Sequence, residues 1–312
     1  MTLVSIITPS FNQAAYLEET IQSVLSQDYT ELEYIVVDGG STDGSLDIIQ
    51  RYAGKLAWWI SEPDSGQAEA INKGLAHARG EIVAWLNSDD VYLPGAVNSA
   101  VTTLQANPES GMVFGNMLAI DESGRTINVL KYGDVNLEDL LAFSIIGQPA
   151  VFLRHSVLDQ AGGLDTSFHF LLDHHLWIRV ASRVELKHVP VLWAAARYHP
   201  AAKNLTHASN FGKEAFRILE WAEGQTEFAS ILAGCERRAR ASAHRVNARY
   251  LLDGGQSWRA VIAWWQAFCI HPLVALARLN LLASALLNLA GMRGLRSVWL
   301  RWRQRRISKF KV

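Results

Sequence analysis

Cysteine is scarce in this sequence. Only two of the 312 residues are cysteines, Cys235 and Cys269, and neither has a CxxC or CxxH partner. A disulfide framework and a structural zinc site are therefore not indicated, and a reducing compartment fits best.

A basic leader and a long apolar run are also missing. The chain begins MTLVSIITPSFN and enters a strand-like run directly, so no signal peptide is predicted. The longest apolar stretch, residues 272–291, is interrupted by one arginine and two asparagines. This composition argues against a membrane-spanning helix.

Negative charge is absent from the end of the chain, although the formal net charge of the whole is only −1. Residues 254–312 contain no Asp or Glu, but ten of the 29 basic residues. Five tryptophans and a run of arginines fall there, namely Trp258, Trp264, Trp265, Trp299, Trp302, Arg301, Arg303, Arg305 and Arg306. This pattern predicts contact with an anionic membrane surface. The alternative is helices that only pack on the preceding domain; nucleic acid is not expected, because no recognition motif is present.

The first hundred residues alternate apolar strand runs with helix-sized segments. LVSIITP, LEYIVVD, LAWWIS and EIVAWLN are the strand runs, and they are nearly continuous in apolar character. This alternation predicts an α/β, Rossmann-like, mostly parallel sheet flanked by helices. Ligands of such sheets bind outside the carboxyl ends of the strands. Asp38 and the pair Asp89 and Asp90 follow two of these runs, so we expect them to face one crevice.

The pattern changes after residue 107, where hairpin, helix and strand signals mix, and from about residue 210 it is wholly helical. We therefore expect one domain at 1–207, with halves at 1–107 and 108–207, and a helical extension at 208–312.

The adjacent carboxylates in LNSDD need an explanation, because like charges at the end of a buried strand repel. One interpretation is a helix cap, since Pro94 stands near the start of the next helix. The other is a hard metal ion held by oxygen ligands.

Five motifs occur in order: TPSFN, VVDGGSTDGS, SEPDSGQAEAINKG, LNSDD and GGLD followed by LLDHHLWIR. Together they resemble the family 2 inverting glycosyltransferases of the glycosyltransferase-A fold, over about residues 3–205. The resemblance implies that 1–107 binds a nucleotide sugar and that 108–207 forms the acceptor side.

The resemblance also implies donor-binding residues in the first three motifs, namely Thr8, Pro9, Asn12, Asp38, Gln67 and Asn72. A carboxylate can accept a hydrogen bond from a uracil or thymine ring N–H, which would be the role of Asp38. The alternative for Asp38 is that it only ends its strand and caps the turn before two glycines.

By the same resemblance, Asp90 binds Mg²⁺ or Mn²⁺ on the donor diphosphate, and Asp89 approaches the ribose or the metal. A divalent ion would stabilise the departing diphosphate as a Lewis acid. Many relatives carry Asp where this chain has Asn87, which we expect to support the loop instead.

LLDHHLWIR matches the family's EDYDLWLR helix, which implies that Asp173 is the general base. Leu172 and His175 depart from that pattern, and the alternative for Asp173 is a helix cap. Gln148 and His175 are assigned to the acceptor side.

ARYHPAAKN resembles the RxHxxxK segment of close relatives. Arg197, His199 and Lys203 would then close over the diphosphate. The alternative is an exposed basic loop.

The predicted function is sugar transfer from a nucleoside diphosphate donor, UDP- or dTDP-type, to a hydroxyl acceptor. A lipid-linked glycan intermediate of cell-surface polysaccharide synthesis is the expected acceptor, met in the cytoplasm or on the inner face of the membrane. The alternatives are an inactive binding module and a sugar-nucleotidyltransferase, although the usual Gly-rich loop with Lys or Arg does not follow the first strand.

Overall fold

A computed structural model describes residues 2–199 and 207–292 of the chain. These described residues divide into two compact units, the first within the ranges 1–136 and 146–197 and the second within 137–145 and 198–312. The second unit takes in Tyr198 and also Leu137–Ile145.

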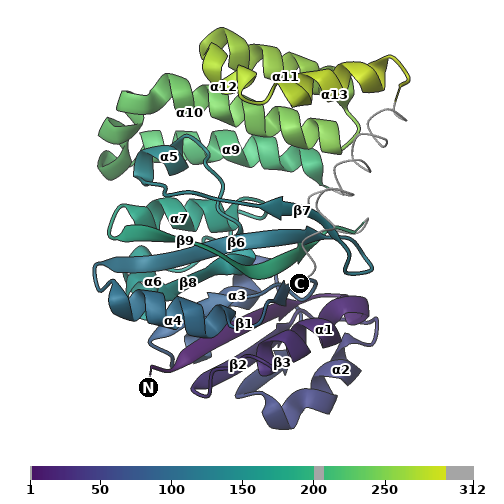
Figure 1. The fold of residues 1–312 in the computed structure, drawn as a ribbon, viewed down its shortest axis with the longest axis vertical. Helices are drawn as coiled ribbons and strands as arrows, with labels where there is room; N and C mark the ends of the chain where they lie inside the picture. Colours follow the sequence, from purple (N-terminus) through teal and green to yellow (C-terminus); the bar gives the residue numbers. More distant parts are fainter. Residues whose placement is uncertain (1, 200–206, 293–312) are drawn as a thin grey trace. The chain divides into compact units, whose positions relative to one another are not determined.

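The first unit is built on one nine-stranded sheet (Figure 1). Its strands are β1 (Val4–Ser10), β2 (Leu32–Asp38), β3 (Trp58–Ser61), β4 (Ile82–Trp85), β5 (Val91–Tyr92), β6 (Ser110–Ile120), β7 (Thr126–Leu130), β8 (Val151–Arg154) and β9 (Glu185–Arg197). The order is β3-β2-β1-β4-β8-β6-β9-β5, with β7 paired to β6.

The sheet is parallel in its first half and mixed in its second. β1 pairs in parallel with β2 and β4, and β2 with β3. β8 then runs antiparallel to both β4 and β6, while β9 is parallel to β6 and antiparallel to β5. The α/β class is as predicted. Parallel pairing, however, dominates only within residues 1–107, among β1, β2, β3 and β4.

Six α-helices and two short 3-10 helices accompany the sheet in the described part of the first unit. The α-helices are α1 (Ala14–Leu25), α2 (Ser45–Tyr52), α3 (Gln67–His77), α4 (Ala96–Ala106), α6 (His155–Ala161) and α7 (Leu172–Ala181), and the 3-10 helices are η1 (Ala53–Lys55) and η2 (Gln148–Ala150). Val4 and Ile6 of β1 pack in the core that α1 and α4 share, whereas Ile7 faces Gly74 of α3. β1 is thus buried on both faces, which explains its continuous apolar sequence.

The second unit is helical. It contains α5 (Leu137–Leu141), α9 (Ala208–Glu223), α10 (Thr226–Asp253), α11 (Ser257–Ile270), α12 (Pro272–Leu276) and α13 (Leu279–Leu289). Ala241, Ala260, Trp264 and Ala285 belong to its core, where small alanines let the helices approach closely. α5 joins this unit through Arg238, whose guanidinium donates to Asp139 at 2.6 Å.

Candidate active site

The parallel strands bring the polar loops to one edge of the sheet. Ser10, the last residue of β1, pairs with Asp38, the last residue of β2. β4 ends beside them, because the Leu86 amide donates to the Ile7 carbonyl at 2.9 Å. The loops after β1, β2 and β4 therefore leave the sheet at the same edge, as the parallel arrangement predicted.

Asp90 is the buried member of the acidic pair, with 5% of its surface exposed, while Asp89 is half-buried. Asp90 Oδ1 accepts a hydrogen bond from the Arg197 amide at 2.9 Å, and Asp90 Oδ2 accepts one from Asn87 Nδ2 at 3.1 Å. Burial, and next the charge of Asp89, raise the pKa of Asp90 well above its ordinary value. A cation placed near the Asp90 carboxylate would offset both effects.

The donor set fits a hard divalent ion. Mg²⁺ is commonly bound by one or two carboxylates plus substrate phosphates and water. Each Asp90 oxygen keeps a lone pair beyond the hydrogen bond that it accepts. Within residues 2–199 and 207–292, no three His, Cys, Asp or Glu side chains gather into a complete metal site. The remaining ligands would have to come from the donor.

Arg197 is bonded to the acidic loop in this structure. Its side chain is 1% exposed and its Nη2 lies 2.7 Å from Glu19 Oε2. Nε donates to the Asp89 carbonyl at 3.0 Å, and Nη1 reaches the carbonyls of Asp121 and Glu122 at 3.3 Å. These bonds occupy the guanidinium within the protein, and the contact between Arg197 and a diphosphate stays a prediction.

Asp38 is fully buried and caps its own loop. Oδ2 accepts from the amides of Gly40 (3.1 Å) and Ser41 (2.9 Å) and from the Ser61 hydroxyl (2.7 Å), while Oδ1 accepts from the Ser41 hydroxyl. Three of these bonds are made to Oδ2 and one to Oδ1, and the whole side chain is buried, so the carboxylate serves its own loop and Ser61. The geometry favours the turn-capping alternative over a contact with the nucleobase.

The other predicted donor contacts in the β1 segment are also structural. The Thr8 hydroxyl is fully buried and bonds the Tyr34 hydroxyl at 3.0 Å, and Pro9 is buried in β1, so neither side chain is available to a donor. Asn12 adopts the left-handed conformation (φ 51°) and its Oδ1 accepts from the Thr42 amide at 2.9 Å. It ties the loops after β1 and β2 together.

Gln67 and Asn72 of α3 behave differently from one another. Gln67 Nε2 donates to Asn87 Oδ1 at 2.6 Å, so Gln67 does reach the acidic motif through Asn87. Asn72 instead clamps the backbone of Leu164, donating to its carbonyl at 2.8 Å and accepting from its amide at 3.0 Å. Since both ends of that amide are used, the predicted contact between Asn72 and the donor is not supported.

Asp173 lies in the first turn of α7 and is half-buried, whereas its neighbours from Leu171 to Ile178 are buried. Its carboxylate therefore stands at the accessible end of the helix. His175 is 2% exposed and stacks on Phe168 with ring centroids 4.2 Å apart, so the structure places it in the core, and its role on the acceptor side stays a prediction. Gln148, 8% exposed, donates from Nε2 to the Trp85 carbonyl at 2.6 Å, at the end of β4.

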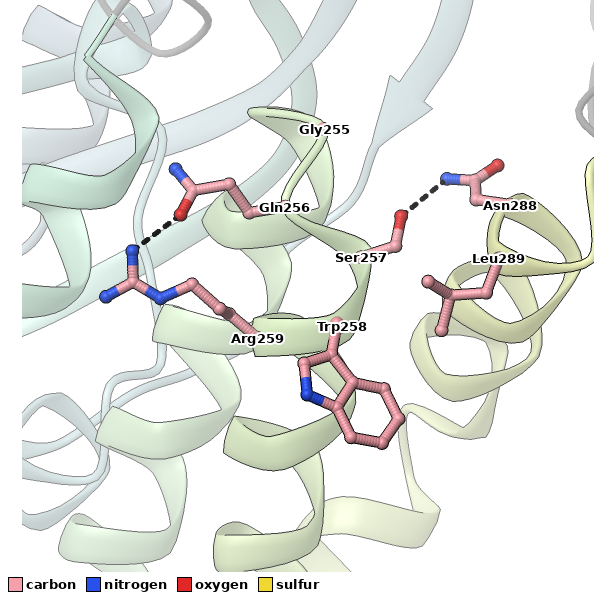
Figure 2. A pocket seen from close by; sticks show the side chains of 7 residues that line it. All are labelled: Gly255, Gln256, Ser257, Trp258, Arg259, Asn288 and Leu289. Carbon is pink, nitrogen blue, oxygen red and sulfur yellow. Dashed lines mark hydrogen bonds between the residues drawn. The ribbon is translucent and has the colours of Figure 1, made fainter.

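His199 is 4% exposed and belongs to the second unit, and Lys203 lies outside the described residues. The pocket in Figure 2 is lined by Gly255–Arg259, Asn288 and Leu289 of the second unit and includes none of the predicted site residues.

Two contributors were missed by sequence reasoning. Ser61 and Glu19 bond Asp38 and Arg197 from 23 and 178 positions away along the chain. Ser61 is the first residue of the motif SEPDSGQAEAINKG, whereas Glu19 lies outside the five motifs; neither position reveals its partner.

Solved structures share this fold. TarS of S. aureus aligns with a TM-score of 0.61 and 18% identity, over 91% of this chain and 54% of that one. The mannosyltransferase PcManGT of Pyrobaculum calidifontis, solved with GDP-Man and Mn²⁺, aligns with a TM-score of 0.60 and 21% identity, over 96% and 87%. The fold is that of the glycosyltransferase-A class.

Sequence comparison gives the family. The model of glycosyl transferase family 2 matches residues 5–161, and the chain belongs to that family. An uncharacterized glycosyltransferase of Rickettsia conorii is 28% identical over 64% of this chain and 34% of its own length. One of Mycobacterium tuberculosis is 33% identical over 57% and 68%. The chain thus spans from about a third to two thirds of the length of these two relatives.

Proposed function

We propose that the protein is an inverting glycosyltransferase that moves a sugar from a nucleoside diphosphate donor to a hydroxyl acceptor. The observation that carries this proposal is the acidic pair at the end of β4, in the same compact unit as the accessible Asp173. The similarity to TarS, which was solved with UDP-GlcNAc, supports a UDP- or dTDP-type donor. PcManGT, solved with GDP-Man and Mn²⁺, supports a divalent metal.

In the proposed mechanism, Asp173 takes the proton of the acceptor hydroxyl. The oxygen forms a bond to the anomeric carbon from the face opposite the diphosphate, and the bond between that carbon and the diphosphate oxygen breaks. Asp89 and Asp90 would hold Mg²⁺ or Mn²⁺, which supplies Lewis-acid stabilisation of the leaving diphosphate. Gln67 and Asn87 orient Asp90 through their side-chain amides, and the Arg197 amide holds the other Asp90 oxygen.

The test uses Asp173→Asn, which keeps the shape of the side chain but removes its basicity. Nucleoside diphosphate release is measured without acceptor across a panel of nucleotide sugars, so that slow hydrolysis identifies the donor. We expect Asp173→Asn to lower this rate by about two to four orders of magnitude with donor affinity retained. Asp159→Asn on α6, a well-exposed carboxylate, is the control and should not change the rate. Near-normal release by Asp173→Asn would place the base elsewhere.

We further propose that the second unit lies against an anionic membrane at the cytoplasmic face, where a lipid-linked glycan acceptor would be met. Large apolar side chains are exposed on α11, α12 and α13 and shortly after α13: Trp258, Ile262, Trp265, Leu273, Leu276, Leu279, Leu286, Leu289 and Met292. We call these nine residues the apolar surface. Trp258 and Leu289 line the pocket between the start of α11 and the end of α13 (Figure 2).

The charge of this segment suits anionic lipid, because residues 254–312 contain no acidic side chain. Trp264 is the exception among the three described tryptophans of the segment, since it is buried and donates to the Ala275 carbonyl at 3.1 Å. Trp299, Trp302 and the terminal arginines lie outside the described residues. No helix in the described ranges has the length and apolar character that crossing a membrane requires.

A further inference from the structure

Because Asp38 is fully buried and hydrogen-bonded within its own loop, it presents no acceptor to a nucleobase in this structure. The residue next to it points to another carboxylate. Gly39 follows Asp38 directly. A Cβ added to Gly39 would lie 2.8 Å from Asp64 Oδ2 and 3.2 Å from Asp64 Cγ. The Asp64 carboxylate therefore fills the space that a side chain at position 39 would occupy.

Lack of room for a side chain, and not an unusual backbone conformation, accounts for the glycine at position 39. Gly40 has a positive φ of 80°, whereas Gly39 is not among the residues with positive φ. An L-residue can adopt the backbone of Gly39 without strain, so the close approach of Asp64 is the constraint. The loop carrying Asp64 is fixed there, since the Glu62 amide donates to the Asp38 carbonyl at 3.0 Å.

Asp64 has an oxygen to offer. Oδ1 accepts from the Gly66 amide at 2.8 Å, whereas Oδ2 has no hydrogen bond within the part of the chain that the structure covers. Asp64 is only half-buried, so its free oxygen can meet a ligand. Burial, with smaller contributions from Glu69 and Asp38, raises the pKa of Asp64. A carboxylate in this state is stabilised by an incoming hydrogen-bond donor.

An aromatic ring stands on the neighbouring loop. Phe11, directly after β1, is 60% exposed. Its loop is tied to the loop after β2, because the Asn12 amide donates to the Ser41 hydroxyl at 2.8 Å and Asn12 accepts from Thr42. An exposed ring provides the stacking surface that nucleobases use, and a carboxylate reads the edge of the base.

We propose that Asp64, reaching past Gly39, accepts the ring N–H of the donor's nucleobase and so selects the nucleotide. This inference rests on the proposed transferase function. Uracil and thymine present N3–H and guanine presents N1–H, whereas cytosine N3 and adenine N1 are lone-pair acceptors that a carboxylate repels. Asp64 therefore favours uridine, thymidine or guanosine diphosphates over those of cytidine and adenosine.

The experiment measures the binding of UDP, GDP, CDP and ADP to the full chain by calorimetry in the presence of Mn²⁺. The wild type should bind UDP or GDP at least about tenfold more tightly than CDP and ADP, as expected for a hydrogen bond to a charged group. Asp64→Asn should lower the affinity for the favoured nucleotide about 10- to 100-fold. It should raise the affinity for CDP, because an amide can donate to cytosine N3 and accept from its N4–H₂ group. Glu62→Gln, two residues away and paired with Lys73, should leave all four affinities within about twofold.

A rescue variant separates recognition from folding. Asp64→Ala should lose the preference, and Gly39→Asp combined with Asp64→Ala should restore it, because that side chain enters the vacated space. The inference is overturned if Asp64→Asn keeps wild-type affinities, if the double variant rescues nothing, or if the wild type prefers CDP or ADP. A wild type that binds none of the four nucleotides overturns the proposed function itself.

Discussion

Asp90 is oriented by a relay of side-chain amides. Gln67 donates to Asn87 Oδ1, and Asn87 Nδ2 donates to Asp90 Oδ2. An aspartate at position 87 would add a third negative charge and could not donate to Asp90. The expectation that Asn87 supports this loop is confirmed by these contacts.

The relay makes Asp90→Asn a clean test of the metal assignment. If the amides of Asn87 and Gln67 rotate by half a turn, the new amide at position 90 is still hydrogen-bonded. The change also removes a buried negative charge beside Asp89. We therefore expect a melting temperature no lower than that of the parent, together with loss of Mn²⁺-dependent nucleotide binding in calorimetry. A variant that retains metal-dependent binding would show that another residue holds the ion.

Arg197 allows a second prediction at this scale. Lysine cannot reproduce a guanidinium that reaches Glu19 and the carbonyls of Asp89 and Asp121 together. We expect Arg197→Lys to lower the free energy of unfolding by about 2–3 kcal/mol, measured by denaturant titration. Nucleotide affinity, measured where the variant is folded, should fall less than about threefold.

The control for that experiment is Arg51→Lys, at an exposed ion pair with Glu18, which should change the free energy of unfolding by less than about 0.5 kcal/mol. Unchanged stability of Arg197→Lys with a large loss of nucleotide affinity would support the predicted contact between Arg197 and the diphosphate.

Among the elements, α3 connects packing to the site, because it carries Gln67 and lies closely on β1. A Cβ at Gly74 would come within 2.4 Å of Ile7 Cγ2 and 3.3 Å of Val37 Cγ2. Glycine is a poor helix former, so its presence in the third turn of α3 reflects this close approach.

Gly74→Ala should therefore destabilise the protein, although alanine favours helices. Overpacking costs about 1–3 kcal/mol and the gain in helix propensity offsets up to about 1 kcal/mol, which leaves a loss of about 1–2 kcal/mol. Gly54→Ala, where an added Cβ meets nothing within 4 Å, should change the free energy of unfolding by less than about 1 kcal/mol. Denaturant titration of both variants checks this, and equal stability of the two would contradict the packing argument.

The elements differ in how far sequence alone predicts them. β1, β2 and β4 are buried on both faces, so continuous apolar runs mark them. The two-residue β5 has no such mark, because its pairing with β9 joins residues about a hundred positions apart. α5 was expected in the first domain, yet Asp139 bonds Arg238, and no local pattern announces a partner that distant.

The same limit applies to the candidate site. The sequence predicted which loops meet, since strand ends follow from the periodicity. It did not predict which polar side chains would be used by the protein itself. Asp38 and Asn72 were predicted to bind the donor. Their hydrogen-bond partners, Ser61 and Leu164, lie far from them along the chain, so the sequence gives no sign that these side chains are already used.

Acidic and basic residues are distributed unevenly along the whole chain. Residues 1–253 carry all 30 acidic residues, including the proposed metal ligands and base, whereas residues 254–312 carry only basic ones. The apolar surface lies in the second part, where acidic residues would oppose contact with anionic lipid.

Co-sedimentation with liposomes tests this separation. We expect the full chain to bind vesicles containing phosphatidylserine at low salt, to bind phosphatidylcholine vesicles more weakly, and to be released by high salt. A serine variant that combines Trp258→Ser, Trp265→Ser and Leu273→Ser replaces three side chains that are each more than half exposed. It should bind the vesicles about tenfold or more weakly, because less apolar area enters the interface. Val191→Ser on β9, which removes an exposed apolar side chain of the first unit, should not change it.

A chain ending at Gly291 keeps eight of the nine residues of the apolar surface, all except Met292, and removes most of the basic residues of the segment 254–312. Because electrostatic attraction is about 1 kcal/mol for each basic residue near anionic lipid, loss of residues 292–312 should weaken binding strongly at low salt. The contribution of Trp258 and Trp265 is apolar and should persist in high salt, so the serine variant and the shortened chain should respond differently to ionic strength. If the full chain fails to bind anionic vesicles at low salt, the last helices serve only to pack the second unit, and the acceptor is a soluble molecule.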